Sequence, residues 1–139
     1  MFQHILVPTD FSKKSQHAVD IAVEIALLNK GCVELLHVIE TIPHTAFDEF
    51  KDFYAKLETH TEQEMEKLIA PYRKKSLKIE SEIVFGHRVE EILNFTETHK
   101  VDLIVMNSHR VDLTDPTQGW GTISYKVGAL SLCPILLVK

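Results

Sequence analysis

The chain has 139 residues, of which 45% are hydrophobic and 25% are charged. This mixture is typical of a folded globular protein and too apolar for a disordered one. Fifteen Lys and Arg against twenty Asp and Glu give a formal net charge of −5, whereas nucleic-acid binders usually present a basic face. No apolar run is long enough to cross a membrane, and the first residues lack the pattern of a signal peptide. We therefore expect one cytoplasmic domain, residues 1–139, that binds neither nucleic acid nor membranes.

Short apolar runs alternate with helix-like apolar repeats along the chain. In chain order the sequence predicts a strand at 5–7, a helix between Ser12 and Gly31, a strand at 32–39, a helix at about 46–70, a strand at 77–85, a short helix at 89–95, a strand at 103–106, a helix at 122–130 and a strand at 134–138. Ser12 is expected to cap its helix and Gly31 to stop it. Thr59–Thr61 interrupts the apolar pattern of the second helix, which leaves a kink there open.

Strands that alternate with helices form β-α-β units and a parallel sheet covered on both faces. We therefore predict an α/β fold, with five parallel strands in an open sheet and about four helices on its two faces. No linker, repeat or low-complexity stretch divides the chain.

Metal ligands are not grouped in the sequence. Cys32 and Cys133 are isolated in apolar segments and match neither a metal motif nor a disulfide framework. The eight histidines are scattered and lack the i, i+4 pairing that binds zinc on a helix. We expect no metal site, and we interpret His37, which lies within an apolar strand, as a hydrogen-bonded core residue.

Polar residues follow the strands at the edge where open parallel sheets bind ligands. Pro8, Thr9 and Asp10 come directly after the first strand. A carboxylate at this point can accept hydrogen bonds from ribose hydroxyls or orient a base. With equal weight, Asp10 simply opens the next helix, whose macrodipole favours a negative charge.

The segments 107–110 and 119–122 offer a second candidate site. Glycine lets backbone N–H groups approach an anion, and the start of a helix carries positive potential. Phosphates could therefore lie between Arg110 and the Gly121–Thr122 turn, with Thr122 and Ser124 adding hydroxyl donors. On these residues alone the simpler interpretation is favoured, in which Gly121 forms a turn and Thr122 caps a helix.

The runs ILVPTDFS, LLHVI and DLIVMNSHR, followed by GT and CPILLVK, resemble the universal stress protein family in order and spacing over essentially the entire chain. The resemblance implies a Rossmann-like fold. In nucleotide-binding members Asp10 would lie near the ribose and the backbone of Val38 near the adenine. The phosphates would lie on G-x-x-G, a loop of about nine residues and then G-[ST]. The resemblance also implies a homodimer through the last strand, at Pro134, Ile135, Leu136, Leu137 and Val138.

The candidate nucleotide-binding residues are Pro8, Thr9, Asp10, Val38, Met106, Asn107, His109, Arg110, Gly121, Thr122, Ile123 and Ser124. The phosphate motif is degenerate, because Asn107 and Arg110 stand where its first two glycines are expected and the loop is one residue longer. Asn tolerates left-handed dihedrals, so Asn107 could still form the turn. Arg110 could pair directly with phosphate oxygens.

Two functions remain open. The first is a stress-response protein that binds ATP or a related adenine nucleotide, with Mg²⁺ where ATP is bound, and hydrolyses it little or not at all. The second is a dimeric interaction protein of the same family that binds no nucleotide, as the degenerate glycine motif would allow. An ATPase that uses Asp10 with a metal is the weakest hypothesis, because no residue pair is placed as base and transition-state clamp. We therefore name no catalytic residue.

Overall fold

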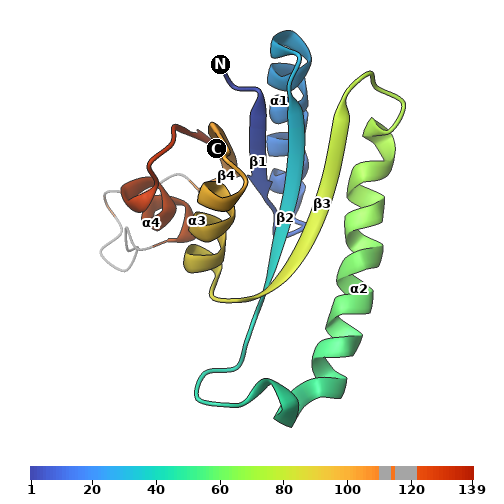
Figure 1. Ribbon diagram of the computed structural model, residues 1–139, viewed down its shortest axis with the longest axis vertical. Coiled ribbons are helices and arrows are strands. Elements are labelled where there is room, and N and C mark those ends of the chain that lie inside the picture. Colours follow the sequence, from blue (N-terminus) through green and yellow to red (C-terminus); the bar gives the residue numbers. More distant parts are fainter. Residues whose placement is uncertain (110–113, 115–121) are drawn as a thin grey trace.

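The computed structural model describes residues 1–109, 114 and 122–139 (Figure 1). Within these residues five strands alternate with four α-helices, which are β1 (His4–Pro8), α1 (Lys13–Asn29), β2 (Cys32–Glu40), α2 (Lys51–Ile69), β3 (Lys78–Gly86), α3 (Arg88–Thr98), β4 (Leu103–Asn107), α4 (Ile123–Leu130) and β5 (Ile135–Val138). Two short 3₁₀ helices, Phe47–Phe50 and Ala70–Tyr72, flank α2. The nine predicted elements are all present, with ends that differ by a few residues.

The strands form one parallel sheet in the order β3-β2-β1-β4-β5. The chain moves outward from β1 to β3 and then returns to the other side of β1, so the direction of winding reverses between β1 and β4. This is the arrangement of a Rossmann-like α/β fold, and the crevice at the reversal is where such sheets bind ligands. The predicted fold class is confirmed.

Successive side chains of β1 point to opposite faces of the sheet, as strand geometry requires. Ile5 and Val7 pack in a cluster with α1 and α2, whereas Leu6 packs with α3 and α4 in a second cluster. Ile5, Leu6 and Val7 have no exposed surface. A strand buried on both faces is a continuous apolar run rather than an alternating one, which is why this short segment could be recognised in the sequence.

Helix α1 begins and ends by two different devices. The Ser12 hydroxyl oxygen accepts a hydrogen bond from the Ser15 N–H at 3.3 Å, so Ser12 caps the helix as predicted. At the other end Lys30, rather than Gly31, takes the left-handed conformation, with φ 55°. Gly31 is needed for a different reason: a Cβ there would lie 2.7 Å from the backbone oxygen of Gln3, where β1 begins.

The helix predicted at 46–70 is divided at its start but not in its middle. A 3₁₀ turn at Phe47–Phe50 precedes α2, which then runs without a break from Lys51 to Ile69. The kink left open at Thr59–Thr61 is absent. Thr59 donates its hydroxyl hydrogen to the Ala55 carbonyl at 3.1 Å and therefore remains compatible with a regular helix.

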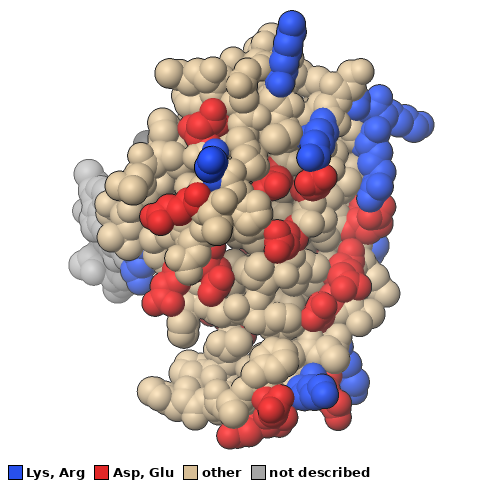
Figure 2. All heavy atoms as spheres, in the orientation of Figure 1, with Lys and Arg blue, Asp and Glu red and all other residues tan. Residues whose placement is uncertain are grey.

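One face of β3 is polar because no described helix covers it. In Figure 1 the amino-terminal parts of β2 and β3 lie beside α3 and α4 rather than behind them. Lys78, Glu80 and Glu82 are exposed on this strand. Lys78 Nζ lies 3.5 Å from Glu80 Oε1, and His99 Nε2 lies 3.9 Å from Glu82 Oε2. Figure 2 shows acidic and basic side chains interspersed over this face, with acidic ones at its centre. The alternation at 77–85 thus marks an uncovered part of the sheet.

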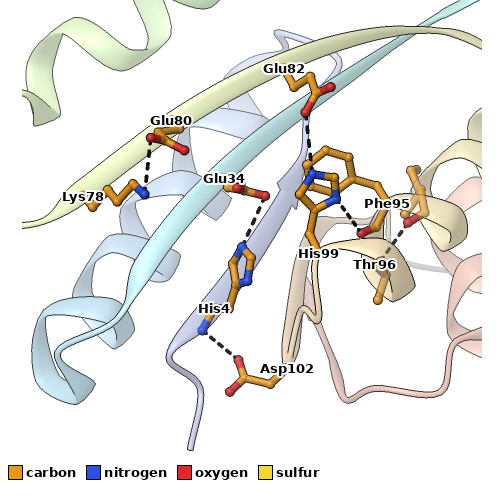
Figure 3. A network of polar contacts seen from close by, with 10 residues as sticks. His4, Glu34, Lys78, Glu80, Glu82, Phe95, Thr96, His99 and Asp102 are labelled. Atoms are coloured by element: carbon orange, nitrogen blue, oxygen red, sulfur yellow. Dashed lines mark hydrogen bonds and ion pairs between the residues drawn. The ribbon is translucent and has the colours of Figure 1, made fainter.

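Polar side chains at the amino-terminal edge of the sheet pair with one another (Figure 3). Asp102 accepts hydrogen bonds from the backbone N–H groups of Gln3, at 3.0 Å, and His4, at 2.9 Å, one on each carboxylate oxygen. His4 Nε2 lies 3.2 Å from Glu34 Oε2. Both of these side-chain atoms are buried, with no other partner among the described residues. These contacts tie β1, β2 and the start of β4 together.

Candidate nucleotide-binding cleft

A cavity of about 230 Å³ opens at the carboxyl ends of β1, β2 and β4. Its walls come from these strand ends together with α3 and the start of α4, and the lining residues are Pro8, Thr9, Asp10, Leu36, His37, Val38, Arg88, Ile92, Met106, Asn107, Ile123 and Ser124. The cavity therefore lies at the point where the winding of the sheet reverses. Apolar walls with a few convergent polar groups are typical of small-molecule sites.

The turn from β1 to α1 is tight and holds Asp10 at the mouth of the cavity. Phe11 has a positive φ of 63°, a backbone conformation that residues other than glycine seldom adopt. Its N–H donates to the Thr9 hydroxyl oxygen at 3.1 Å, which closes the turn. Strained residues of this kind persist where the surrounding structure fixes them, and they are frequent at functional sites.

The hydrogen bonds between the Asp10 side chain and other described residues all involve one of its two carboxylate oxygens. Oδ1 accepts hydrogen bonds from the Ser15 hydroxyl at 2.6 Å and from the Ser12 N–H at 3.0 Å. Burial alone would raise the pKa of Asp10, but the Ser12 and Ser15 side chains, together with backbone N–H groups, outweigh it and hold the pKa below its usual value of 3.8. Oδ2 has no hydrogen bond to any described residue. Asp10 is therefore an ionised carboxylate near pH 7 with one oxygen open to a ligand.

The side chain of Asn107 links the end of β4 to the first turn of α1. Its Oδ1 lies 3.2 Å from the hydroxyl oxygen of Ser15, which is fully buried. The sequence left a left-handed turn open at Asn107, and the residue does not form one, because it is not among the described positions with positive φ. It is the last residue of β4 and pairs with Val138 of β5, so the ladder holds its backbone extended.

His37 lines the cavity rather than lying entirely in the core. Its Nδ1 is 2.7 Å from the Thr9 carbonyl oxygen, and its ring stacks on that of Phe11 with centroids 4.6 Å apart. Burial lowers the pKa of His37 below its usual value of 6.5 and is the largest influence; the positive charge of Arg88 acts in the same direction. The sequence interpretation was correct about the hydrogen bond but missed that the residue is part of the cavity lining.

Arg88 and Ile92 are cavity residues that the sequence did not predict. Arg88 is the first residue of α3 and pairs through Nε with Glu40 Oε1 at 3.2 Å. Arg88 and Ile92 are four positions apart in α3, so they lie on one face of the helix. The available signal was only that α3 follows a strand end. Which of its faces meets the crevice depends on packing that a single sequence does not contain.

A second hollow of about 340 Å³ adjoins the first and shares Asp10, Asn107, Ile123 and Ser124 with it. Its other lining residues are Ser12, Lys14, Ser108, His109 and Thr122. Because the two hollows share these walls, we refer to them together as the cleft.

Hydroxyl groups line this second hollow at the start of α4. Ser124 donates to the Ser108 hydroxyl oxygen at 3.1 Å, and Thr122 Oγ1 lies 3.3 Å from Ser124 Oγ. Thr122 is the residue before α4, but its side chain makes no capping hydrogen bond. The sequence interpretation of Thr122 as a helix cap is therefore correct for its position and wrong for its side chain. Its hydroxyl remains near the unpaired N–H groups that begin a helix.

Lys139 supplies a positive charge beside the second hollow. Its Nζ donates to the Tyr125 hydroxyl at 2.9 Å, and it lies 3.4 Å from the His109 carbonyl oxygen and 3.5 Å from the Ser108 hydroxyl. The same contact with Lys139 lowers the pKa of Tyr125. Lys139 was not a predicted site residue, because only the fold brings it beside β4.

Ten of the twelve predicted site residues lie in the cleft. Those lining the first hollow are Pro8, Thr9, Asp10, Val38, Met106, Asn107, Ile123 and Ser124, and those lining only the second are His109 and Thr122. The other two, Arg110 and Gly121, lie outside the described residues.

No group of three or more His, Cys, Asp or Glu side chains in the described part of the chain is arranged to hold a metal ion. No helix within 1–109 or 122–139 is long and apolar enough to cross a membrane.

The sequence matches one protein-family model over residues 1–139, that of the universal stress protein family. The chain belongs to this family. It is 28% identical over 156 residues to universal stress protein YxiE of Bacillus subtilis, with 100% of both chains covered. It is also 28% identical over 157 residues to universal stress protein MJ0577 of Methanocaldococcus jannaschii, covering 100% of this chain and 96% of that protein. The predicted family is confirmed.

Solved structures agree with this assignment. The structure of MJ0577 has a TM-score of 0.83 at 31% identity, covering 100% of this chain and 96% of that one. A universal stress protein in complex with cAMP has a TM-score of 0.69 at 23% identity, with 99% and 97% covered. The universal stress protein of Archaeoglobus fulgidus in complex with dAMP has a TM-score of 0.73 at 16% identity, with 100% of both covered. At these low identities the last two show the shared fold alone.

Proposed function

We propose that this universal stress protein binds an adenine nucleotide, ATP or AMP, in the cleft at the carboxyl ends of β1, β2 and β4. The observation that carries this proposal is the Asp10 carboxylate, fixed through Oδ1 and open at Oδ2 beside an apolar cavity. An ionised acceptor held in one orientation suits the vicinal hydroxyls of a ribose, because charge-assisted hydrogen bonds are the strong ones.

The first hollow suits a nucleobase. Leu36, Val38, Ile92 and Met106 supply apolar walls for the faces of a planar ring. Two neighbours with this fold are described as complexes with cAMP and dAMP, both of which carry adenine. Adenine is therefore the base that we propose for this chain.

The second hollow suits the phosphates. It contains the Thr122 and Ser124 hydroxyls at the start of α4, where unpaired N–H groups and the helix dipole favour anions. Lys14 lines this hollow and Lys139 lies beside it, so two lysine side chains can offset phosphate charge. These groups would act where Asn107 replaces the first glycine of the phosphate motif.

Binding with little or no hydrolysis is the mode that we propose. Asp10 is the single carboxylate among the described residues that line either hollow. Mg²⁺ that arrives with ATP would find one carboxylate ligand there and would keep most of its water and phosphate ligands. A phosphoryl-transfer site also requires a group that positions water and a clamp on the transferred phosphate, and the described lining supplies no such pair.

A second candidate function is a dimeric interaction protein with no nucleotide. The specific observation in its favour is Asn107, whose side chain contacts Ser15 at the position where the family motif has glycine. A side chain there occupies space that a glycine would leave to the phosphates.

The two candidates are separated by calorimetric titration of the purified protein with ATP and Mg²⁺, after extraction and assay of any co-purified nucleotide. We expect a dissociation constant in the micromolar range, which corresponds to a binding free energy of about −8 kcal/mol. Asp10→Asn keeps an oxygen for Ser12 and Ser15 but replaces the open oxygen with an N–H donor. We expect it to weaken binding about 10-fold or more, whereas Asp48→Asn, at an exposed residue that lines neither hollow, should leave binding unchanged. No heat and no co-purified nucleotide would favour the interaction protein.

We also propose a homodimer through β5. This strand is an edge of the sheet, and an unpaired apolar edge strand invites pairing with another chain. Leu136 of β5 is 38% exposed although it lies in an apolar run. Light scattering after size exclusion should give the mass of a dimer for the unaltered protein and a larger monomer fraction for Leu136→Lys. Leu28→Lys, an equally apolar exposed site on α1, should remain dimeric. A monomeric unaltered protein would contradict the proposal.

The cytoplasm is the compartment that we propose. Cys32 and Cys133 are both unbonded thiols, as is typical of proteins in a reducing environment. Mass spectrometry after alkylation of a cell extract should find both thiols free, and a disulfide-linked form would argue against this location.

A further inference from the structure

The ion pair between Glu40 and Arg88 lies where β2 meets α3, on the face of the sheet that holds the first hollow. Successive strand residues point to opposite faces, so Glu40 shares the face of Leu36 and Val38, which line that hollow. Arg88 lines it too, one helical turn before Ile92 on the same face of α3. Arg88 Nε is 3.2 Å from Glu40 Oε1. Because Glu40 is not itself a lining residue, the pair stands at the rim of the hollow.

Stabilising the fold is a small part of what this pair can do. The Arg88 and Glu40 side chains are 50% and 48% exposed, and an ion pair with this exposure contributes at most about 1 kcal/mol to stability. Neither side chain has another hydrogen-bond or ion-pair partner among the described residues. Most of their donor and acceptor positions therefore remain available to a ligand.

The order of the strands directs the base of a bound nucleotide toward this pair. In space β1 lies between β4 and β2. The hollow proposed for the phosphates is at the ends of β4 and α4, and Asp10, proposed for the ribose, follows β1. The base then extends along the sheet to the walls that Leu36 and Val38 form at β2. The exocyclic amine of adenine is on the side of the ring away from the ribose, so this edge of the base would face β2 and α3.

The chemistry of the pair is complementary to this edge. Carboxylate oxygens only accept hydrogen bonds, and guanidinium N–H groups only donate them. Adenine presents an amine donor beside a ring-nitrogen acceptor, whereas guanine and hypoxanthine have a carbonyl acceptor in place of the amine. A guanidinium alone would suit guanine, and a carboxylate alone would suit any amine. The two groups side by side suit adenine.

We propose that Glu40 and Arg88 are specificity-determining residues that distinguish adenine from other purines. The Glu40 carboxylate accepts a hydrogen bond from the exocyclic amine, and the Arg88 guanidinium donates one to an adjacent ring nitrogen, N7 or N1. This inference rests on the proposed function, because it concerns the same cleft. It adds two side chains that read the base, at positions where the sequence indicated no site residue.

The probes are ATP and ITP, which differ only at the amine edge of the base and share the ribose and the triphosphate. Calorimetric titration in the presence of Mg²⁺ gives the affinity for each, and the ratio of the two affinities reports how the base is read. A structural role for the pair would change both affinities by the same factor and leave the ratio unaltered. The 7-deaza and 1-deaza analogues of ATP each lack one ring nitrogen and identify the acceptor that meets Arg88.

The test variants are Glu40→Gln and Arg88→Met, and a second exposed ion pair supplies matched controls. Gln keeps the shape of Glu but offers an N–H donor as well as an acceptor, and Met keeps an unbranched chain without a donor. Arg73 Nη2 lies 2.6 Å from Glu66 Oε2, in a pair that is 57% and 63% exposed. Neither of these residues lines the cleft, so Glu66→Gln and Arg73→Met make the same chemical changes elsewhere. Circular dichroism verifies that each variant is folded.

We expect the unaltered protein to bind ATP about 10-fold more tightly than ITP, the effect of one hydrogen bond to a charged acceptor. Glu40→Gln should reduce this preference to about twofold or less, because its amide can donate to the carbonyl of hypoxanthine. Arg88→Met should bind ATP about 3- to 10-fold more weakly, yet match the unaltered protein with the deaza analogue that lacks the true acceptor. Both control variants should behave as the unaltered protein does with every nucleotide.

Two kinds of result would overturn the inference and leave the proposed function intact. Equal affinities of the unaltered protein for ATP and ITP would do so without any variant. An unchanged ratio in Glu40→Gln, or a loss in Arg88→Met that is the same for ATP and both deaza analogues, would show that other groups read the base. If ATP does not bind, AMP and IMP replace ATP and ITP. Failure of the unaltered protein to bind either adenine nucleotide would overturn the proposed function and the inference together.

Discussion

The two ends of the sheet use the same residue types in opposite ways. At the amino-terminal end both carboxylate oxygens of Asp102 accept backbone N–H groups, from Gln3 and His4. At the carboxyl-terminal end Asp10 has described hydrogen bonds on Oδ1 alone, and Oδ2 is open. A carboxylate whose two oxygens both accept backbone N–H groups stabilises the fold. One that is fixed on one side and open on the other is prepared for a ligand.

The histidines repeat this contrast. His4 Nε2 is buried 3.2 Å from Glu34 Oε2, a partner on the neighbouring strand. His37 instead hydrogen-bonds through Nδ1 to the Thr9 carbonyl oxygen at 2.7 Å, and the residue is part of the cavity lining. This contrast supports the proposal that the carboxyl-terminal end is the ligand site and that the amino-terminal end is structural.

Among the variants that test this contrast, Gly31→Ala at the amino-terminal end should have the largest effect on stability. A Cβ at this position would lie 2.7 Å from the Gln3 backbone oxygen, so the start of β1 would have to move. We expect a loss of about 3 kcal/mol in the free energy of unfolding, measured by urea denaturation. Gly128→Ala, in α4 with nothing within 4 Å of the new Cβ, should be neutral or slightly stabilising. Equal losses in the two variants would contradict the packing described here.

Asp102→Ala tests whether the paired carboxylate is only structural. Removal of two hydrogen bonds to a charged acceptor should lower the free energy of unfolding by about 2 kcal/mol. Nucleotide affinity, measured by calorimetry on the folded variant, should change less than twofold. A 10-fold loss of affinity with unchanged stability would reverse the roles that we assign to the two ends.

Much of the fold could be predicted because strands buried on both faces are short apolar runs. Ile5–Val7 and Leu103–Met106 are such runs, and both lie at the centre of the sheet. The helix ends were less accessible. Lys30 takes the left-handed position expected near Gly31, because Gly31 is required for its close approach to β1.

The site was predictable where it follows from the ends of the strands and not where it follows from packing. Asp10 could be named because parallel strands end at one edge of the sheet, whereas Val38 was named only through the family resemblance. Arg88 could not, since its role depends on how α3 is rotated against β2. The left-handed turn that the sequence left open at Asn107 is not formed, because pairing with β5 extends β4 through that residue, and nothing in the local sequence reports that pairing.

A smaller effect should appear in the dependence of stability on pH. The pKa of His37 is lower in the folded protein than its usual 6.5, so the unfolded chain takes up a proton that the folded one does not. Stability should therefore fall as the pH drops below about 6.5, by up to about 1.4 kcal/mol for each pH unit until the folded-state pKa is reached. Urea denaturation at pH 7.5 and 5.5 should show a smaller drop for His37→Asn than for His60→Asn. Equal drops would show that His37 is not buried in its neutral form.

The most direct test of the central claim is a two-dimensional ¹H–¹⁵N NMR titration of the unaltered protein with ATP and Mg²⁺, because it observes both ends of the sheet at once. We predict saturable shifts of the amide signals of Asp10, Val38 and Ser124, while those of Gln3 and Asp102 stay in place. Shifts confined to the amino-terminal end, or none at all, would contradict the assignment of the carboxyl-terminal cleft as a nucleotide site.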